Sequence, residues 1–151
     1  MLSRRYQEDI SLHQASIGDI VFQKDRECNL QGTNGILVNN YNLDKINKQI
    51  AKGNCFPTAP LIGYDSQLAA GKPGDIERAI IHEEEIDPTK FNVPGLPQFA
   101  SAGMRRIVLA PISDLQVHGT DNTLHLSFSL TKGCYATSLL REFMKAPITN
   151  Y

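Results

Sequence analysis

The chain has 151 residues, a length that fits one domain with a real core and rarely two. Its 41% hydrophobic and 21% charged residues are typical of a globular protein, and neither an apolar run of membrane-spanning length nor a charged-then-apolar leader is present. Three widely spaced cysteines (Cys28, Cys55 and Cys134) argue against a disulfide framework and against a zinc site, so we expect a reducing, cytoplasmic location.

The net charge of −1 gives no overall sign of nucleic-acid binding, but the charges are unevenly spread. Residues 75–90 hold six acids and two bases, a local balance of −4, whereas residues 100–151 hold five bases and three acids, a balance of +2. The basic side chains are therefore in excess toward the C-terminal end of the sequence.

Residues 1–10 are predicted to form a helix with Leu2, Tyr6 and Ile10 on one face. Its charged side chains are expected off that face: Arg4, Arg5, Glu8 and Asp9. No capping residue precedes the pattern, so either residues upstream of Met1 have been lost or a frayed helix starts at the initiator methionine.

Two short apolar runs at residues 20–22 and 36–38 are typical of strands, and the turn-rich residues 31–35 separate them. A helix with Asn42 as its N-cap is then expected through Lys52. Three lysines are spaced to share one side of this helix: Lys45, Lys48 and Lys52. A solvated face is the default interpretation of these lysines, and a phosphate-binding stripe is the alternative.

Proline and glycine dominate residues 54–74, which we predict to be a loop. Lys72 lies among glycines there, but the spacing is not that of a phosphate-binding P-loop. Asp75 is the expected cap of the helix that follows. The run H-E-E-E-I in that helix looks like a zinc protease motif, but Ile86 stands where the second histidine would have to be.

The last third of the chain predicts three antiparallel strands and a helix, which together make a compact α+β unit. The strands are expected at residues 106–111, 115–118 and 124–130. In the third strand apolar residues alternate with polar ones, as in a half-buried strand. His118 and His125 lie in these strands without a partner acid at a telling spacing, so we interpret them as structural.

The periodicity changes at Gly133, where the third strand gives way to a helix. Tyr135, Leu139 and Phe143 recur at four-residue steps, which predicts an amphipathic helix. Its N-terminal N–H groups, beside Lys132, favour an anion such as phosphate or carboxylate. A plain strand–loop–helix unit is the simpler interpretation of the same pattern.

The amino-acid sequence of this turn and helix closely resembles the C-terminal signature of the TruD family of tRNA pseudouridine synthases. It reads K-G-C-Y-A-T-S-L-L-R-E-F-M-K at residues 132–145. Members of that family usually read K-G-S-Y-A-T followed by two aliphatic residues and R-E. Cys134 therefore replaces the usual serine by another small residue. A weaker resemblance is to the late G-T-Y-I-R-S-L motif of a second pseudouridine synthase family, TruB.

Earlier stretches resemble the archaeal branch of TruD: P-L-I-G-Y at residues 60–64 and G-K-P-G-D-I-E-R-A-I-I at residues 71–81. Residues 103–106 (G-M-R-R) are similar to a G-x-R-R that the family carries before the chain re-enters the catalytic domain. The resemblance implies an α+β fold in which residues 1–103 are part of the TruD-specific insertion domain. Residues 104–151 would be the C-terminal segment of the catalytic domain, with antiparallel strands and a final helix.

By the same resemblance, the intact enzyme converts a uridine in the D-arm region of tRNA to pseudouridine, with an aspartate nucleophile and no metal or organic cofactor. The family supplies this aspartate in a G-x-K-D-x-x-A-x-T motif and an aromatic residue in an N-x-F-G-x-Q-R-F-G motif, and neither occurs in this sequence. Five other aspartates have local explanations as turn, cap or surface residues: Asp19, Asp44, Asp65, Asp75 and Asp114.

We therefore expect this chain to be the C-terminal part of the enzyme, inactive by itself, with the N-terminal half either lost or supplied by a partner chain. A catalytic sheet without its other strands exposes edges and an apolar face, which favours self-association. No membrane partner is expected.

The resemblance also suggests which residues would form a pocket for a flipped-out uridine. Tyr135 would stack on the base, or else anchor the helix as a core aromatic. Leu139 or Leu140 would be the pocket floor, although core packing explains either more simply. Arg141 would meet the missing aspartate or a phosphate, with a surface position or another ion pair as the favoured alternative.

Phosphate contacts are expected from Lys132 and from the neighbouring Arg105 and Arg106, which would position tRNA without reading its sequence. A non-catalytic RNA-binding or assembly module that keeps the insertion domain is the alternative function. A small α+β interaction protein is a third, which the match of residues 132–144 to the family signature disfavours.

Overall fold

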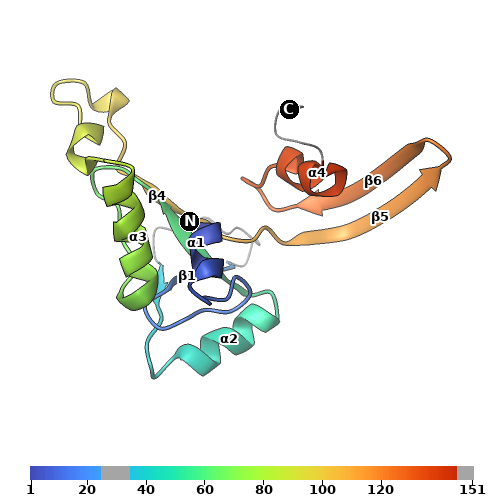
Figure 1. Cartoon of the computed structure of the whole chain (residues 1–151), viewed down its shortest axis with the longest axis horizontal. Coiled ribbons are helices and arrows are strands. Elements are labelled where there is room, and N and C mark those ends of the chain that lie inside the picture. Colours follow the sequence, from blue (N-terminus) through green and yellow to red (C-terminus); the bar gives the residue numbers. More distant parts are fainter. Residues whose placement is uncertain (25–34, 146–151) are drawn as a thin grey trace. The chain divides into compact units, whose positions relative to one another are not determined.

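The computed structural model of the chain describes residues 1–24 and 35–145 (Figure 1). They divide into two compact units, Met1–Leu109 (unit 1) and Ala110–Tyr151 (unit 2). The turn predicted at residues 31–35 lies, except for its last residue, outside the described part of the chain, as does Cys28.

Unit 1 combines helices with an antiparallel sheet of strand order β2-β1-β3-β4. Its α-helices are α1 (Leu2–Gln7), α2 (Leu43–Ala51) and α3 (Gly71–Glu83), and two short 3-10 helices follow them, η1 (Pro88–Phe91) and η2 (Pro97–Phe99). Its strands are β1 (Ile20–Gln23), β2 (Ile36–Leu37), β3 (Cys55–Leu61) and β4 (Met104–Ile107).

The core of unit 1 lies against α2. The buried side chain of Ile46 packs there with residues from β1 and from the loops around it: Ala15, Val21 and Val38. Leu43 and Ile50, on the same side of the helix, cover this cluster. Asn42 is the N-cap of α2, so the predicted helix and its cap position are confirmed.

Strand β3 lies inside the stretch that was predicted to be a loop, and that prediction was wrong. Its prolines, Pro57 and Pro60, are the reason, because proline in the middle of a sheet normally removes a ladder hydrogen bond. The strand pairs with β1 only through residues 55–57 and with β4 only through residues 58–61. Apart from the Pro57 carbonyl, which accepts from the Val108 N–H at 2.9 Å, each half therefore has a ladder partner on one side only, a setting in which proline is tolerated.

Helix α1 presents a different face to the core than the sequence pattern predicted. Arg5 and Ile10 are buried, whereas Tyr6 is 77% exposed. The Arg5 guanidinium forms a buried ion pair with Asp19, with Nη2 2.9 Å from Oδ2, and Oδ2 also accepts a hydrogen bond from the N–H of Ser16. The prediction that Arg5 faces outward was therefore wrong. Asp19 does close the turn at residues 16–19, where its N–H donates to the Ser16 carbonyl at 3.0 Å, but its side chain is buried.

Helix α3 begins at Gly71, with Ala70 as its N-cap, so Asp75 lies inside the helix and is not its cap. The carboxylate of Asp75 instead accepts a 2.9 Å hydrogen bond from Arg78 on the exposed side. Near the C-terminal end of α3, Glu83 forms an ion pair of 2.7 Å with Arg4, which joins α3 to α1.

Unit 2 is a β-hairpin followed by a helix: β5 (Ile112–Thr120), β6 (Thr123–Leu130) and α4 (Ala136–Met144). Asp114 has a positive φ of 55° where the register of the hairpin shifts. The hairpin and helix confirm the α+β prediction for this region. The expected three-stranded unit was wrong, because the first of the three strands, β4, pairs with β3 in unit 1.

Candidate functional site

The turn between β6 and α4 is closed by contacts between its two ends. The N–H of Cys134 donates to the carbonyl of Thr131 at 3.1 Å, and the Thr131 hydroxyl lies 3.2 Å from the Cys134 sulfur. Gly133, between them, has a φ of 89°, a left-handed conformation that favours glycine. The predicted strand–turn–helix connection is confirmed, and the small residue at position 134 fits the contact with Thr131.

The predicted pocket residues follow this turn along α4. Tyr135 is the N-cap residue and is 66% exposed, so in this structure its ring lies outside any core. Leu139, one turn later, is half-buried, and Leu140 is 36% exposed. Arg141 is exposed on the same helix. The structure therefore brings the four residues onto one short helix and its cap, and encloses none of them.

Unit 2 has no buried side chain among the residues that the structure describes. On β6 the side chains alternate between exposed and half-buried, as the sequence pattern predicted. Large apolar side chains of the hairpin are left at least two-fifths exposed: Ile112, Leu115, Val117 and Leu124. The hairpin thus presents apolar surface that no described residue of unit 2 covers.

The side chain of Arg105, on β4, is extensively hydrogen-bonded inside unit 1. Its Nη2 lies 2.6 Å from Glu77 Oε1, and both side chains are at most 4% exposed. Its Nε donates to the Thr58 hydroxyl at 2.8 Å, and Nη2 also donates to the Thr58 carbonyl. Nη1 donates to the carbonyl of Gln67 at 2.7 Å. Arg105 therefore ties β3, β4, α3 and the β3–α3 loop together.

This network also explains why three stretches of the resemblance described above belong together. Residues 60–64 end β3, residues 71–81 form α3 with Glu77, and residues 103–106 begin β4. Gly63 and Gly103 are in close backbone contact, since a Cβ on Gly63 would lie 2.1 Å from the Gly103 nitrogen. Sequence reasoning identified each stretch but missed the ion pair, because nothing in the spacing of residues 77 and 105 signals that they meet.

The three residues expected to contact phosphate have different positions. Lys132 is exposed in the turn of unit 2. Arg106 is half-buried and adjoins Arg105 on β4, so the two side chains lie on opposite faces of the strand. The guanidinium of Arg105 is engaged inside unit 1, which leaves no surface of it for a phosphate.

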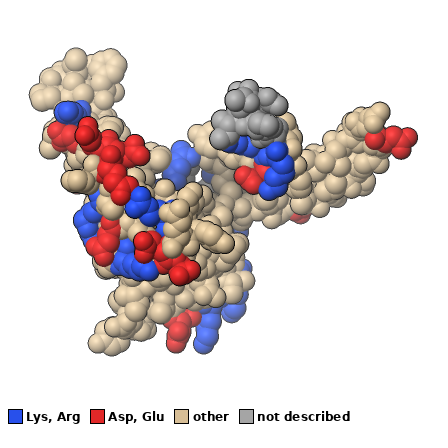
Figure 2. Space-filling view, in the orientation of Figure 1, with Lys and Arg blue, Asp and Glu red and all other residues tan. Residues whose placement is uncertain are grey.

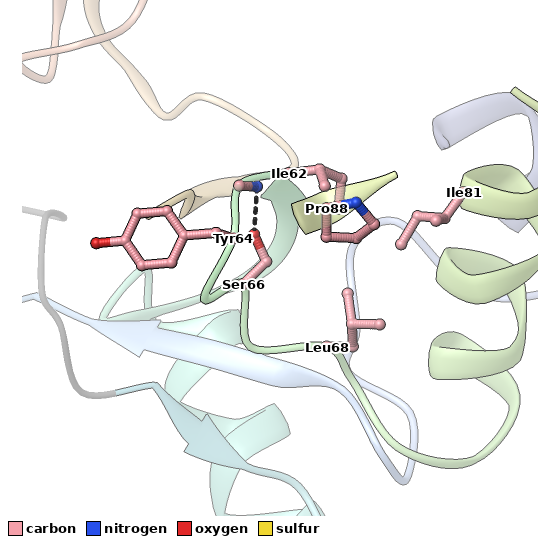
Figure 3. A pocket seen from close by; sticks show the side chains of 7 residues that line it. Ile62, Tyr64, Ser66, Leu68, Ile81 and Pro88 are labelled. Carbon is pink, nitrogen blue, oxygen red and sulfur yellow. Dashed lines mark hydrogen bonds between the residues drawn. The ribbon is translucent and has the colours of Figure 1, made fainter. Parts of the chain in front are cut away.

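A small hollow in unit 1 lies between the end of β3 and the C-terminal part of α3 (Figure 3). Its volume is about 80 Å³, and its lining is mostly apolar, with Ile62, Leu68, Ile81 and Pro88. The hydroxyl of Ser66 accepts a hydrogen bond of 2.7 Å from the Gly63 N–H beside it. Ligand pockets usually measure several hundred Å³, so this hollow is too small to be the candidate site.

Three further features of the described part of the chain bear on the kind of site it can hold. No three His, Cys, Asp or Glu residues lie close enough there to hold a metal ion. No helix in residues 1–24 or 35–145 is long and apolar enough to cross a membrane. Burial raises the pKa of the Cys55 thiol, which makes it a poor nucleophile at neutral pH. The exposed turn of unit 2 therefore remains the candidate site.

Comparison with known families gives one clear match. The family described as tRNA pseudouridine synthase D (TruD) matches residues 1–143. A probable tRNA pseudouridine synthase D of Methanococcoides burtonii is 35% identical over an alignment of 151 residues, which covers 96% of this chain and 34% of that protein. One from Thermococcus sibiricus is 38% identical over 144 residues, 95% of this chain and 34% of the relative. The chain spans about a third of the length of the curated relatives it matches.

A solved structure agrees with the sequence comparisons. The crystal structure of the putative tRNA pseudouridine synthase D (TruD) from Methanosarcina mazei superposes with a TM-score of 0.86 and 31% sequence identity. The match covers 99% of this chain and 36% of that protein. The α+β fold with antiparallel sheets is therefore that of part of the Methanosarcina protein.

Proposed function

The chain belongs to the tRNA pseudouridine synthase D (TruD) family, and from this premise we propose that it is the C-terminal part of an enzyme that isomerises a uridine of tRNA to pseudouridine. The observation that carries the proposal is the family match, which extends over residues 1–143 and so includes both compact units. The match of the K-G-C-Y turn to the family signature agrees with it.

The state of unit 2 supports the view that further strands belong beside it. A hairpin whose side chains are all at least partly exposed gains little from the hydrophobic effect, and an open strand edge invites pairing. In the proposal, residues 104–151 are the returning segment of a catalytic domain and residues 1–103 are part of an insertion domain. Unit 1 extends to Leu109, beyond this boundary at residue 103, because β4 pairs with β3 in unit 1.

The proposed reaction breaks the bond between C1′ and N1 of the uridine, turns the base, and joins C1′ to C5, which then loses its proton. An aspartate outside this chain is the nucleophile, since the family's G-x-K-D motif is absent here. The ring of Tyr135 would stack on the extruded base, and Leu139 and Leu140 would form an apolar floor. A guanidinium such as that of Arg141 close to the aspartate would keep it ionised at neutral pH.

Contacts to the RNA backbone are assigned to exposed or half-buried cations. Lys132, at the turn into α4, and Arg106, on β4, are the proposed phosphate contacts. The buried Arg105 has a different role in this proposal: it anchors β4, so that its neighbour Arg106 is held in place.

Complementation tests the proposal directly. The chain is mixed with the remaining two thirds of an archaeal relative, such as the Methanococcoides burtonii protein cut to lack the matching segment. Release of tritium from tRNA labelled at uridine C5 is then measured. We expect release from the mixture and none from either piece alone, with loss of release when Tyr135→Ala replaces the wild-type chain.

Three other results would change the conclusion. Tritium release by the chain alone would show that it contains a nucleophile after all. Binding of tRNA by the mixture without release would favour a non-catalytic RNA-binding module. Neither binding nor release by a mixture shown to associate would contradict the assignment of these residues to the enzyme.

A further inference from the structure

A second basic surface lies in unit 1, on the side of α2 that faces away from the core. Lys45, Lys48 and Lys52 follow one another at steps of three and four residues, a spacing that places them on one face of α2 and its C-cap, and Tyr41 lies in the turn just before the helix. All four are exposed, and we call them the α2 stripe. Figure 2 shows Lys or Arg side chains projecting from the part of unit 1 that Figure 1 labels α2.

The α2 stripe is held in a fixed orientation by the opposite face of the helix. Ile46 is buried in the core of unit 1, with Leu43 and Ile50 packed beside it. Asn47 adds two hydrogen bonds to Ala15, in which its Oδ1 accepts from the N–H at 2.8 Å and its Nδ2 donates to the carbonyl at 3.1 Å. The stripe thus projects from a rigid platform, so little order has to be gained on binding.

Tyr41 is the least explained residue of this surface, because its side chain is 99% exposed. Its backbone is nevertheless fixed: the Tyr41 N–H donates to Asn39 Oδ1 at 2.9 Å, and Asn42 Oδ1 accepts from the Asn39 N–H at 2.8 Å. A fully hydrated aromatic ring on a fixed turn offers a flat face for stacking, which is what single-stranded or extruded bases require.

The charges of the α2 stripe are available to a ligand. Residues 41–54 hold three lysines and one acid, a balance of +2, in a chain whose net charge is −1. In the described part of the chain, none of these lysines forms an ion pair. Acidic side chains gather instead at the end of α3 and in the turn after it: Glu83, Glu84, Glu85 and Asp87. Within unit 1 a polyanion is therefore drawn to α2 and repelled from the end of α3.

We propose that the α2 stripe is a second RNA-binding surface, on which Lys45, Lys48 and Lys52 contact backbone phosphates and Tyr41 stacks on an unpaired base. The inference rests on the proposed function, which makes tRNA the substrate of this protein. It adds a contact in unit 1 that is separate from the turn of unit 2. Phosphate contacts of this kind supply affinity without sequence specificity.

A single-tryptophan experiment tests the stacking contact. The chain contains no tryptophan, so Tyr41→Trp introduces a unique fluorophore into the full chain. Tyr6→Trp is the matched control, because Tyr6 is 77% exposed on α1. An unmodified tRNA transcript should quench the emission of Tyr41→Trp saturably and leave Tyr6→Trp nearly unchanged. Anisotropy of labelled tRNA measures binding independently. If the emission of Tyr41→Trp is unchanged at tRNA concentrations that saturate this binding, the proposal is overturned.

The phosphate contacts are tested by the salt dependence of the dissociation constant. Replacing all three stripe lysines (Lys45→Gln, Lys48→Gln and Lys52→Gln) should reduce the slope of log K against log salt by about two to three, since each phosphate contact contributes roughly 0.7 to 0.9. A charge-matched control replaces three exposed cations elsewhere in unit 1 (Lys72→Gln, Arg78→Gln and Lys90→Gln) and should change the slope by less than about one. Equal effects of the two triple variants would overturn the proposal.

Failure of this inference can be told apart from failure of the proposed function. If Lys132→Gln weakens tRNA binding while the stripe variants do not, the α2 stripe is a solvated face and the proposed function stands. If neither the wild-type chain nor the associated complementation mixture binds tRNA even at low salt, both proposals fail.

Discussion

Arg105 on β4 and Glu77 on α3 form a buried ion pair, with 2.6 Å between Nη2 and Oε1. The two residues are 28 positions apart in the sequence, and each is at most 9% exposed. Every terminal nitrogen of the guanidinium has an acceptor, and Glu77 Oε2 also accepts from the N–H of Ala69 at 2.7 Å. The pair is thus a fully bonded link between the sheet of unit 1 and the helix beside it.

Removing one partner of this pair should be costly. Glu77→Ala leaves the Arg105 guanidinium buried without its counter-ion, and we expect the free energy of unfolding to fall by about 3–5 kcal/mol. Urea denaturation followed by circular dichroism measures the loss. Asp75→Ala is the control, since the Asp75–Arg78 pair on the same helix is exposed and should contribute at most about 1 kcal/mol. Similar losses for the two variants would show that the buried pair is no more important than a surface one.

The contact between Gly63 and Gly103 predicts a strong effect of a single methyl group. In Gly63→Ala the new Cβ would lie 2.1 Å from the Gly103 nitrogen, so the backbones of the β3 and β4 ends must separate. We expect a loss of about 3 kcal/mol or more in unfolding free energy, at the upper end of overpacking effects. The control is Gly95→Ala, where nothing lies within 4 Å and only the positive φ of 78° is unfavourable to a side chain, so that the change should cost about 1–2 kcal/mol. A milder effect at Gly63 than at Gly95 would contradict the close packing.

The thiols of Cys55 and Cys134 should differ in reactivity. Cys55 is 2% exposed, and burial raises the pKa of its thiol, so the reactive thiolate is scarce at neutral pH. Cys134, in the turn of unit 2, is only half-buried. In a Cys28→Ser background, iodoacetamide at pH 8 should label Cys134 first. Labelling of Cys55 should accelerate as the pH rises toward its raised pKa, and mass spectrometry of the modified peptides follows both sites. Faster labelling of Cys55 at pH 8 would refute the prediction.

The carboxylate of Asp87 should titrate below its ordinary range. The Thr89 hydroxyl donates to Asp87 Oδ1 at 2.7 Å and the Thr89 N–H donates at 3.0 Å, and these hydrogen bonds lower the pKa of the carboxyl by favouring its charged form. A lowered folded-state pKa means that this contribution to stability is present above the unfolded-state pKa and lost as pH falls through the folded value.

Carbon-13 NMR of the Asp87 carboxyl measures that titration. We expect a midpoint below the ordinary aspartate value, and a return toward that value in Thr89→Ala, which removes the hydroxyl donor. A wild-type midpoint no lower than that of Thr89→Ala would show that the hydroxyl does not hold the carboxylate.

Parts of the fold with a strong periodic pattern could be predicted from the sequence. Helix α2 has a clear apolar face and an N-cap, and it starts and ends within a residue or two of the prediction. The hairpin strand β6 and helix α4 follow the change of period at Gly133. In these elements local sequence and three-dimensional structure agree, so the pattern alone is sufficient.

The errors arise where long-range contacts override local signals. Two prolines concealed β3, whose pairing changes from one neighbour to the other along its length. Helix α1 buries Arg5 because Asp19, which lies outside the helix, supplies the counter-charge. Helical periodicity cannot reveal a partner of this kind. Likewise, the sequence identifies Arg105 as a basic residue but does not show that it forms an ion pair with Glu77 inside unit 1.

The candidate site was only partly predictable for a related reason. The turn at Gly133 and the residues of α4 were identified from their match to a family sequence motif. The structure places them together on one exposed segment. Tyr41 was not singled out, because a lone aromatic residue before a helix gives no signal until its exposure is known.

The pairing of β4 with β3 has a practical consequence for anyone who expresses pieces of this protein. A gene fragment that stops at Gly103, the boundary suggested by the family motifs, would delete the edge strand β4. It would also leave the Glu77 carboxylate buried without its partner Arg105. A fragment that continues to Leu109 keeps both, so the cloning boundary should follow the sheet and not the motif.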